Sequence, residues 1–251
     1  LLPRAAVPRH APRSLPVPGR AGRGARLRGR RRPGPAPDVT PGIRNTILGC
    51  LGFMALMLAL FLNNALRERI PTDDELRARG VILLPKPRAL AAFTLTDSSG
   101  DAFTNAALEG QWTFAYFGFT NCPDICPVAM SVLGRARGEL AERGREDHFA
   151  GVLFSVDPQR DTPEALAEYV RYFHEDFEGV TGTREAMAEL ASQVSVAFAA
   201  VPEPSAPDGY VVDHTGNIVL INPRGHYHGY IRPPHSPEQL AFAYEALSAR
   251  L

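Results

Sequence analysis

The sequence predicts a three-layer α/β domain that follows one membrane-spanning helix. Two patterns lead to this prediction: a long uncharged apolar segment near the N-terminus, and buried strand-like runs that alternate with amphipathic helical segments. The composition supports it, because a chain that is 45% hydrophobic and 22% charged can build a normal core. With 251 residues, the chain has room for one ordinary domain plus additional segments.

Residues 1–45 are predicted to form a disordered tail rich in arginine and proline. They contain eleven arginines and a single acidic residue, Asp38, and they show no apolar periodicity. The chain has 27 basic and 27 acidic residues in total, so 16 basic and 26 acidic residues remain after the tail. This acidic remainder argues against nucleic acid as a partner, since binding phosphate requires a basic surface.

Residues 46–62 are predicted to form a transmembrane helix. The seventeen residues from Thr46 to Leu62 carry no charge, which is close to the shortest length that spans a bilayer. The arginine-rich tail precedes this segment, so the positive-inside rule places the N-terminus in the cytoplasm and the following domain outside it. If the segment spans the membrane, Cys50 is expected to be a free thiol within it. A cleaved signal peptide is the alternative.

Residues 63–90 are expected to form a polar, partly helical linker, and residues 91–251 the folded domain. The domain begins with a predicted β-hairpin, in which a strand over 91–97 is joined by a Ser-Ser-Gly turn to a second short strand. Residues 111–120 are dense in aromatic side chains and predict a buried strand. The stretch 149–157 is almost continuously apolar, as expected of a central parallel strand.

The remaining segments complete the alternation of strands and helices. Thr162 and Pro163 form a typical helix start, with a capping side chain followed by a proline at the first helical position. The other expected elements are a helix over 127–143, helices over 162–174 and 184–193, a strand over 194–199, two strands about a Thr-Gly-Asn turn within 209–225, and a closing helix over 236–250.

Two of the three cysteines, Cys122 and Cys126, lie in the stretch "FTNCPDICPVAM" between the aromatic strand and the next helix. A helix N-terminus stabilises thiolate, the form that attacks disulfides and binds metals. A structural disulfide across so short a loop would gain little stability. A reversible redox pair and a metal site both remain open. Three intervening residues allow both sulfurs to lie on one face of a first helical turn.

Two thiolates suit a soft metal with an imidazole as third ligand, and the chain has seven histidines. His226 and His228 alternate along a predicted strand and face one side, as either a second metal site or a solvated strand face. His214 ends an apolar strand and opens a tight turn, from which a side chain can project.

Four motifs in this order resemble the Sco/SenC family: "FGFTNCPDICP", "FSVDPQRDTPEAL", "VTGT" and "YVVDHTGNIVLINPRG". The resemblance covers roughly residues 85–250. It implies a thioredoxin-like fold with an added N-terminal β-hairpin, anchored by one N-terminal transmembrane helix. Because lysine is nearly absent, we expect a bacterial inner-membrane protein with its C-terminal domain in the periplasm. The alternative location is the mitochondrial inner membrane, facing the intermembrane space.

The resemblance also implies a ligand. Family members bind one copper ion per chain, Cu(I) or Cu(II), and by position the ligands would be Cys122, Cys126 and His214. Asp157 matches an acidic residue near the family's metal site. The implied partners are cytochrome c oxidase subunit II, whose dinuclear copper centre the family helps to assemble, and an unidentified copper donor.

Two functions use these same residues. The first is a copper metallochaperone, a binding protein without turnover. The second is a thiol–disulfide oxidoreductase that reduces the copper-site cysteines of the oxidase subunit, with Cys122 as the attacking thiol. Bound copper and a Cys122–Cys126 disulfide are alternative states of the same two sulfurs.

Overall fold

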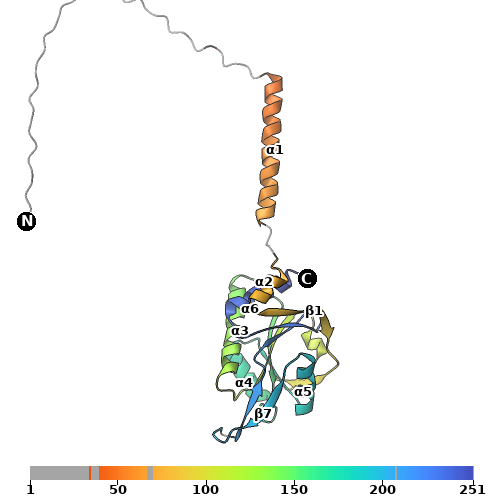
Figure 1. Cartoon of the computed structure of the whole chain (residues 1–251), viewed down its shortest axis with the longest axis vertical. Helices are drawn as coiled ribbons and strands as arrows, with labels where there is room; N and C mark the ends of the chain where they lie inside the picture. The colour runs from red at the N-terminus through yellow and green to blue at the C-terminus, as the bar shows by residue number, and fades with distance from the viewer. Residues whose placement is uncertain (1–33, 35–39, 67–69, 207, 251) are drawn as a thin grey trace, which may run out of the picture. The chain divides into compact units, whose positions relative to one another are not determined.

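The computed structural model describes residues 34, 40–66, 70–206 and 208–250, which divide into an N-terminal unit and a unit from Glu68 to Leu251 (Figure 1). The N-terminal unit contains helix α1, Pro41–Leu66. Its part from Pro41 to Asn64 has a mean hydropathy of 2.1 and is long and apolar enough to cross a membrane. The predicted apolar helix is therefore present and longer than expected. The expected disordered tail lies almost entirely outside the described residues.

The second unit is built on an eight-stranded mixed sheet with strand order β1-β10-β9-β4-β5-β6-β2-β3. Strands β4, β5 and β6 are parallel, and β9 pairs antiparallel with β4. The strand bounds are β1 Val81–Ala89, β2 Thr94–Asp97, β3 Ala102–Thr104, β4 Trp112–Gly118, β5 Phe149–Ser155, β6 Glu178–Thr181, β9 Ile218–Ile221 and β10 His226–Ile231.

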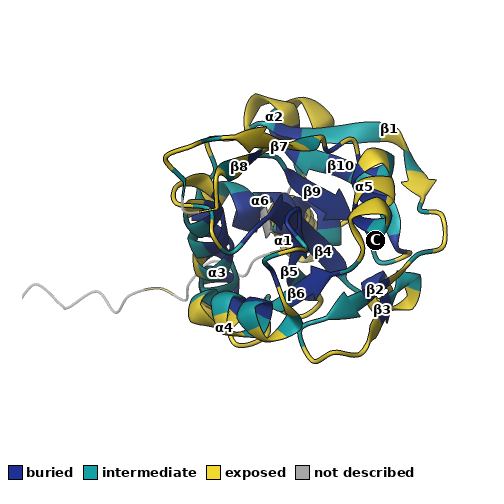
Figure 2. Ribbon diagram, turned by 90° about the horizontal axis from the view of Figure 1, so that it is seen from below, coloured by how far each residue is buried: buried dark blue, intermediate teal, exposed yellow. Residues whose placement is uncertain are grey.

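The aromatic strand β4 lies at the centre of the core, and all seven of its residues are buried. Its ring of Phe114 stacks on Phe149 of β5, with ring centres 4.5 Å apart. Figure 2 shows the central strands as dark blue, buried elements, with α3 and α4 on one side of the sheet and α5 on the other. The three-layer α/β architecture predicted from the alternating pattern is confirmed.

The predicted cap at Thr162 is present, and two further helices begin in the same way. Thr162, Thr183 and Ser236 each accept a hydrogen bond from a backbone N–H of the first helical turn, which stabilises the helix start. The bounds are α3 Ile125–Glu142, α4 Pro163–Phe173, α5 Arg184–Gln193 and α6 Pro237–Ser248. Helix α3 begins two residues earlier than predicted and therefore includes Cys126 in its first turn.

The segment that was expected to be a linker is partly folded into the second unit. A short helix α2, Asp73–Ala78, precedes β1, and β1 pairs antiparallel with β10 at the edge of the sheet. Leu76 and Val81 are buried, with 0% and 1% of their surface exposed. The two prolines of β1 obscured the strand in the sequence, but proline is tolerated on an edge strand.

The expected pair of strands around His214 is also arranged differently. Strand β8, Tyr210–His214, pairs with β7, Phe198–Pro202, and forms a separate two-stranded sheet, which we call the ribbon. Strand β9 instead joins the main sheet, so the Thr-Gly-Asn turn connects two sheets and does not close a hairpin. The strand predicted over 194–199 begins at Phe198, and β6 was not among the predicted strands.

A truncation tests the position of the domain boundary. A chain that starts at residue 91 should be less stable to urea than one that starts at residue 70, by at least about 3 kcal/mol. Each buried aliphatic side chain contributes about 1.5–3 kcal/mol, and Leu76 and Val81 would both be lost. Circular dichroism at increasing urea measures the difference. Equal unfolding midpoints would show that α2 and β1 do not belong to the folded unit.

Candidate metal centre

The cysteine loop begins where the buried strand β4 ends. The N–H of Val156, after β5, donates to the carbonyl of Gly118 at 2.8 Å, which continues the pairing of the two parallel strands up to the loop. The chain then turns, and the N–H of Cys122 donates to the carbonyl of Phe119 at 3.3 Å. Cys122 is half-buried and precedes α3, whereas Cys126 is buried within it, so the two sulfurs do not share a helical turn.

His214 reaches the cysteines from the end of the ribbon. Its Nε2 lies 3.4 Å from the Sγ of Cys126, and its Nδ1 lies 3.3 Å from the carbonyl oxygen of Thr215. A carbonyl oxygen only accepts, so Nδ1 carries the proton and the lone pair of Nε2 faces the sulfur. The rings of Tyr116 and Phe119 meet the imidazole edge-on, each with ring centres 5.9 Å away, and fix its plane.

Cys122, Cys126 and His214 therefore come together as the sequence predicted. Their ligand atoms all lie within 4.8 Å of one another, and no other group of three or more His, Cys, Asp or Glu residues in the described part of the chain could share a metal ion. His226 and His228 lie at the opposite end of the sheet, where His228 packs against Trp112 at the start of β4. The described structure thus offers one donor set of two sulfurs and one imidazole nitrogen.

The two cysteines differ in acidity. A hydrogen bond from the Cys126 thiol lowers the pKa of Cys122 to about 4, although burial opposes this, and two backbone N–H groups add to the effect. The hydrogen bond to the Cys122 thiolate raises the pKa of Cys126, and burial raises it further. The copper-free pair therefore holds one thiolate, at the half-buried Cys122, and one thiol.

Sequence reasoning missed Asp161, which fixes the start of the cysteine loop. Its carboxylate is 1% exposed and accepts hydrogen bonds from the hydroxyls of Thr120 and Ser155, each at 2.6 Å, and from the backbone N–H of Thr120. Burial raises the pKa of this carboxyl group. The only signal in the sequence is its place in "SVDPQRD", where Asp157 was selected instead.

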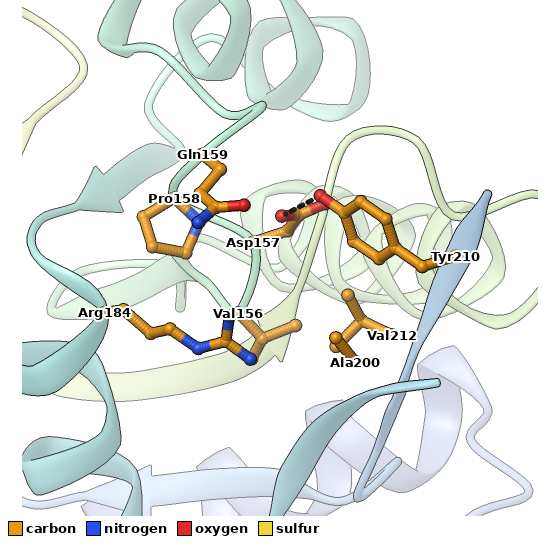
Figure 3. A pocket seen from close by; sticks show the side chains of 8 residues that line it. All are labelled: Val156, Asp157, Pro158, Gln159, Arg184, Ala200, Tyr210 and Val212. Atoms are coloured by element: carbon orange, nitrogen blue, oxygen red, sulfur yellow. Dashed lines mark hydrogen bonds between the residues drawn. The ribbon is translucent and has the colours of Figure 1, made fainter. Parts of the chain in front are cut away.

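Asp157 contacts the ribbon, not the metal ligands. Its carboxylate forms an ion pair with Arg160 and accepts a hydrogen bond from the hydroxyl of Tyr210 at 3.0 Å (Figure 3). Arg160 also pairs with Asp208, at 2.9 Å, on the loop that joins β7 and β8. Asp157, Tyr210 and Val212 also line a cavity of about 150 Å³, so these polar contacts add to the packing of Val212 on the core in holding the ribbon.

Gly118 leaves the space that the Cys126 sulfur occupies. A Cβ atom at this position would lie 2.9 Å from the Sγ of Cys126 and 3.0 Å from the ring of Tyr116. Contacts this short force a neighbour to move, and both neighbours belong to the buried core. The absence of a side chain at residue 118 is therefore a condition for the observed position of Cys126.

A mixed α/β domain with two cysteines and a histidine at the end of a buried strand defines a thiol-based metal-binding or redox protein. Comparison with protein families narrows this class. The family model for SCO1/SenC matches residues 84–248, and the chain belongs to this family.

Two relatives illustrate the match. A candidate copper-binding protein of Stutzerimonas stutzeri is 39% identical over 181 residues, which cover 72% of this chain and 86% of the relative. The human mitochondrial SCO1 homolog is 37% identical over 145 residues, or 58% of this chain. The matched region spans 48% of the human protein, about half its length.

Solved structures share the thioredoxin-like fold. The structure of Arabidopsis thaliana ScoI with copper bound covers 63% of this chain and 98% of its own, with a TM-score of 0.59 and 32% identity. Yeast Sco1 with copper bound covers 66% of this chain and 91% of its own, with a TM-score of 0.60 and 28% identity. The thioredoxin-like fold that the resemblance implied is thus confirmed.

The acidity of Cys122 predicts how its alkylation depends on pH. In the reduced, copper-free Cys50→Ala protein, the rate of Cys122 alkylation by iodoacetamide should stay nearly constant from pH 8 to about pH 5. A lowered pKa keeps the thiolate populated until the pH approaches 4. Replacing Cys126 with alanine removes the main cause of the lowered pKa of Cys122. The alkylation rate should then fall about tenfold for each unit by which the pH is lowered near neutrality. Mass spectrometry measures both rates. A tenfold fall between pH 8 and 7 in the Cys50→Ala protein would contradict the assignment.

The requirement at Gly118 predicts a second effect. Gly118→Ala should weaken the retention of Cu(I) against a chelator and destabilise the protein by about 1–3 kcal/mol, because the new methyl group displaces Cys126. Gly138→Ala is the matched control, since no atom lies within 4 Å of its Cβ position in α3. The control should keep its copper and gain about 0.5–1 kcal/mol of stability. Equal copper retention in the two variants would refute the steric argument.

Proposed function

We propose that the chain is a membrane-anchored copper metallochaperone that holds one copper ion through Cys122, Cys126 and His214. The observation that carries this proposal is the convergence of two sulfurs and one imidazole nitrogen within 4.8 Å. Thiolates favour Cu(I), and imidazole accommodates Cu(II) as well. The residues fit the metal, because Nε2 of His214 presents its lone pair to Cys126 and Gly118 leaves room for the sulfur.

The family supports a proposal for the target of the copper. Sco proteins are associated with cytochrome c oxidase assembly, and one solved structure is described as a member of the Sco family of cytochrome c oxidase assembly proteins. We propose that this chain delivers copper to the dinuclear centre of oxidase subunit II and receives it from a separate donor. A half-buried, three-ligand site suits this task, because an incoming sulfur can replace one ligand at a time.

We further propose that the globular unit lies outside the cytoplasm, in the periplasm of a bacterium. The support is the charge asymmetry around α1: eleven arginines occur in residues 1–45, whereas residues after the helix have a net negative charge. A copper chaperone on this side of the membrane would share a compartment with the copper site of subunit II.

A second function is supported by the acidity of the pair. A half-buried thiolate at Cys122 beside a buried thiol at Cys126 is the arrangement of a thiol–disulfide reductase, in which the first sulfur attacks and the second resolves the mixed disulfide. Such a reductase would keep the cysteines of subunit II reduced. The reductase needs two sulfurs, whereas the chaperone also needs the imidazole.

Substitution of His214 separates the two functions. His214→Ala should retain a Cys122–Cys126 couple that oxidises and reduces reversibly, but it should lose copper, and above all Cu(II), because one of three ligands is gone. Cells that carry this variant should make little active oxidase at low copper, and added copper should partly restore it. His226→Ala is the control, since this histidine lies away from the centre. Normal oxidase assembly with His214→Ala, together with failure of Cys122→Ser, would favour the reductase.

The proposed topology has its own test. A periplasm-dependent reporter fused after Leu251 should be active in a bacterial host, and the fusion should remain in the membrane fraction after a carbonate wash. The helix Pro41–Asn64 supplies the anchor and the preceding arginines its orientation. Release of a soluble fusion trimmed near residue 65 would instead identify the segment as a cleaved signal peptide.

A further inference from the structure

Exposed aliphatic side chains gather around the metal centre. Among the described residues after α1, the large apolar side chains with substantial exposure are Ile70, Ile125, Val128, Tyr172, Val201 and Val211. Ile125 and Val128 lie in the first turn of α3, beside Cys126, and are 45% and 59% exposed. Val201 and Val211 are paired on the ribbon that carries His214. Four of these six residues therefore belong to the elements that supply the metal ligands.

Ile125 and Val128 form one wall of a mostly apolar groove of about 280 Å³. We call this the α3 groove, and its lining residues are Tyr116, Asp124, Ile125, Val128, Ala129, Gly216, Pro233, Pro234 and His235. The groove adjoins the metal centre on both sides: Asp124 and Ile125 lie between the two cysteines in the chain, and Gly216 follows His214 by two residues. Tyr116, at its base, also contacts the His214 ring.

The far wall of the groove is tied to the turn that holds His214. The Nε2–H of His235 donates to the carbonyl of Gly216 at 2.9 Å, so the segment Pro233–His235 and the turn are fixed to each other. The walls come from α3 and from the segment before α6, which are both held by the core through buried residues such as Ala129 and Leu240. The groove is therefore a preformed surface of the domain.

Unpaired negative charge lies at the edge of this surface. Asp124 is exposed at the rim of the α3 groove. Its carboxylate forms no ion pair with any other described residue. An apolar groove with a free carboxylate at its edge is complementary to an aliphatic side chain that is accompanied by a lysine or arginine.

We propose that the α3 groove receives an aliphatic side chain from the metal-site loop of the copper-accepting protein, with a basic residue of that loop beside Asp124. This inference rests on the proposed function. Transfer by ligand exchange requires a sulfur of the acceptor to bond to the copper while this chain still holds it, at a distance of roughly 2.3 Å for a metal–thiolate bond. The acceptor loop must then cover the surface next to Cys122, which is where the groove lies.

The test compares copper transfer with copper extraction. The full chain in detergent, loaded with Cu(I), is mixed with the copper-free soluble domain of oxidase subunit II or with the small chelator bathocuproine disulfonate. Val128→Glu should slow transfer to the protein by about tenfold or more, because a charge in an apolar anchor site opposes docking. Extraction by the chelator needs no docking and should be unchanged, which also shows that the metal centre of the variant is intact.

Two control variants locate the effect. Tyr172→Glu places the same charge at an 85% exposed apolar residue of α4 that does not line the groove, and transfer should be unaffected. Val201→Glu places it on the ribbon. A normal rate of copper transfer in Val128→Glu would overturn the proposal. If Val201→Glu alone slows the transfer, the proposal is also wrong, and the docking site lies on the ribbon.

The charge at the rim gives an independent readout. Asp124→Asn should reduce the dependence of the transfer rate on salt concentration, whereas Glu168→Gln, which neutralises an exposed carboxylate of α4, should not. An identical salt dependence in Asp124→Asn and the unmodified protein would contradict the role of Asp124. If the unmodified protein passes no copper to subunit II at all, the proposed chaperone function itself is wrong.

Discussion

The buried strand β4 fixes where the metal ligands lie. Its seven residues are all buried, and its pairing with β5 extends to the hydrogen bond between Val156 and Gly118, directly before the cysteine loop. Thr120 is then bound by the buried carboxylate of Asp161, so the loop that carries Cys122 is held at both its start and its middle. Two of the three proposed ligands are therefore held by the rigid core of the domain.

The third ligand is held differently. His214 lies on a ribbon outside the main sheet, and the polar contacts of Asp157 with Tyr210 and Arg160 fasten that ribbon to the loop after β5. The ribbon also packs on the core through the buried Val212, and the rings of Tyr116 and Phe119 contact the imidazole, so polar contacts add to packing at this residue. The placement of the imidazole on a separate ribbon is consistent with a site that keeps Cu(I) on its thiolates while the imidazole joins or leaves, and with a pair of sulfurs that also supports disulfide chemistry.

The sequence was sufficient for elements with a strong local signal. Aromatic density identified β4, the capping residue Thr162 and Pro163 identified α4, and the four motifs selected the three residues that the structure brings together. The sequence was insufficient where pairing between distant segments decides which strands form and where they lie. Strand β1 contains two prolines yet pairs with β10, and β8 pairs with β7 and not with the following strand β9. Asp161 was missed for the same reason, since its role depends on Thr120, 41 residues away in the chain, and on complete burial. Asp157 was selected from its position in the motif, but its contacts belong to the ribbon.

We propose that the domain holds one copper ion through two sulfurs and one imidazole nitrogen. X-ray absorption at the copper edge, on the full chain isolated without oxygen and loaded with copper, tests it most directly. We predict one copper per chain with two sulfur ligands and one nitrogen ligand, and loss of the nitrogen ligand in His214→Ala. Two coppers per chain, with one lost in the His226→Ala/His228→Ala protein, or a copper without sulfur ligands, would contradict the account.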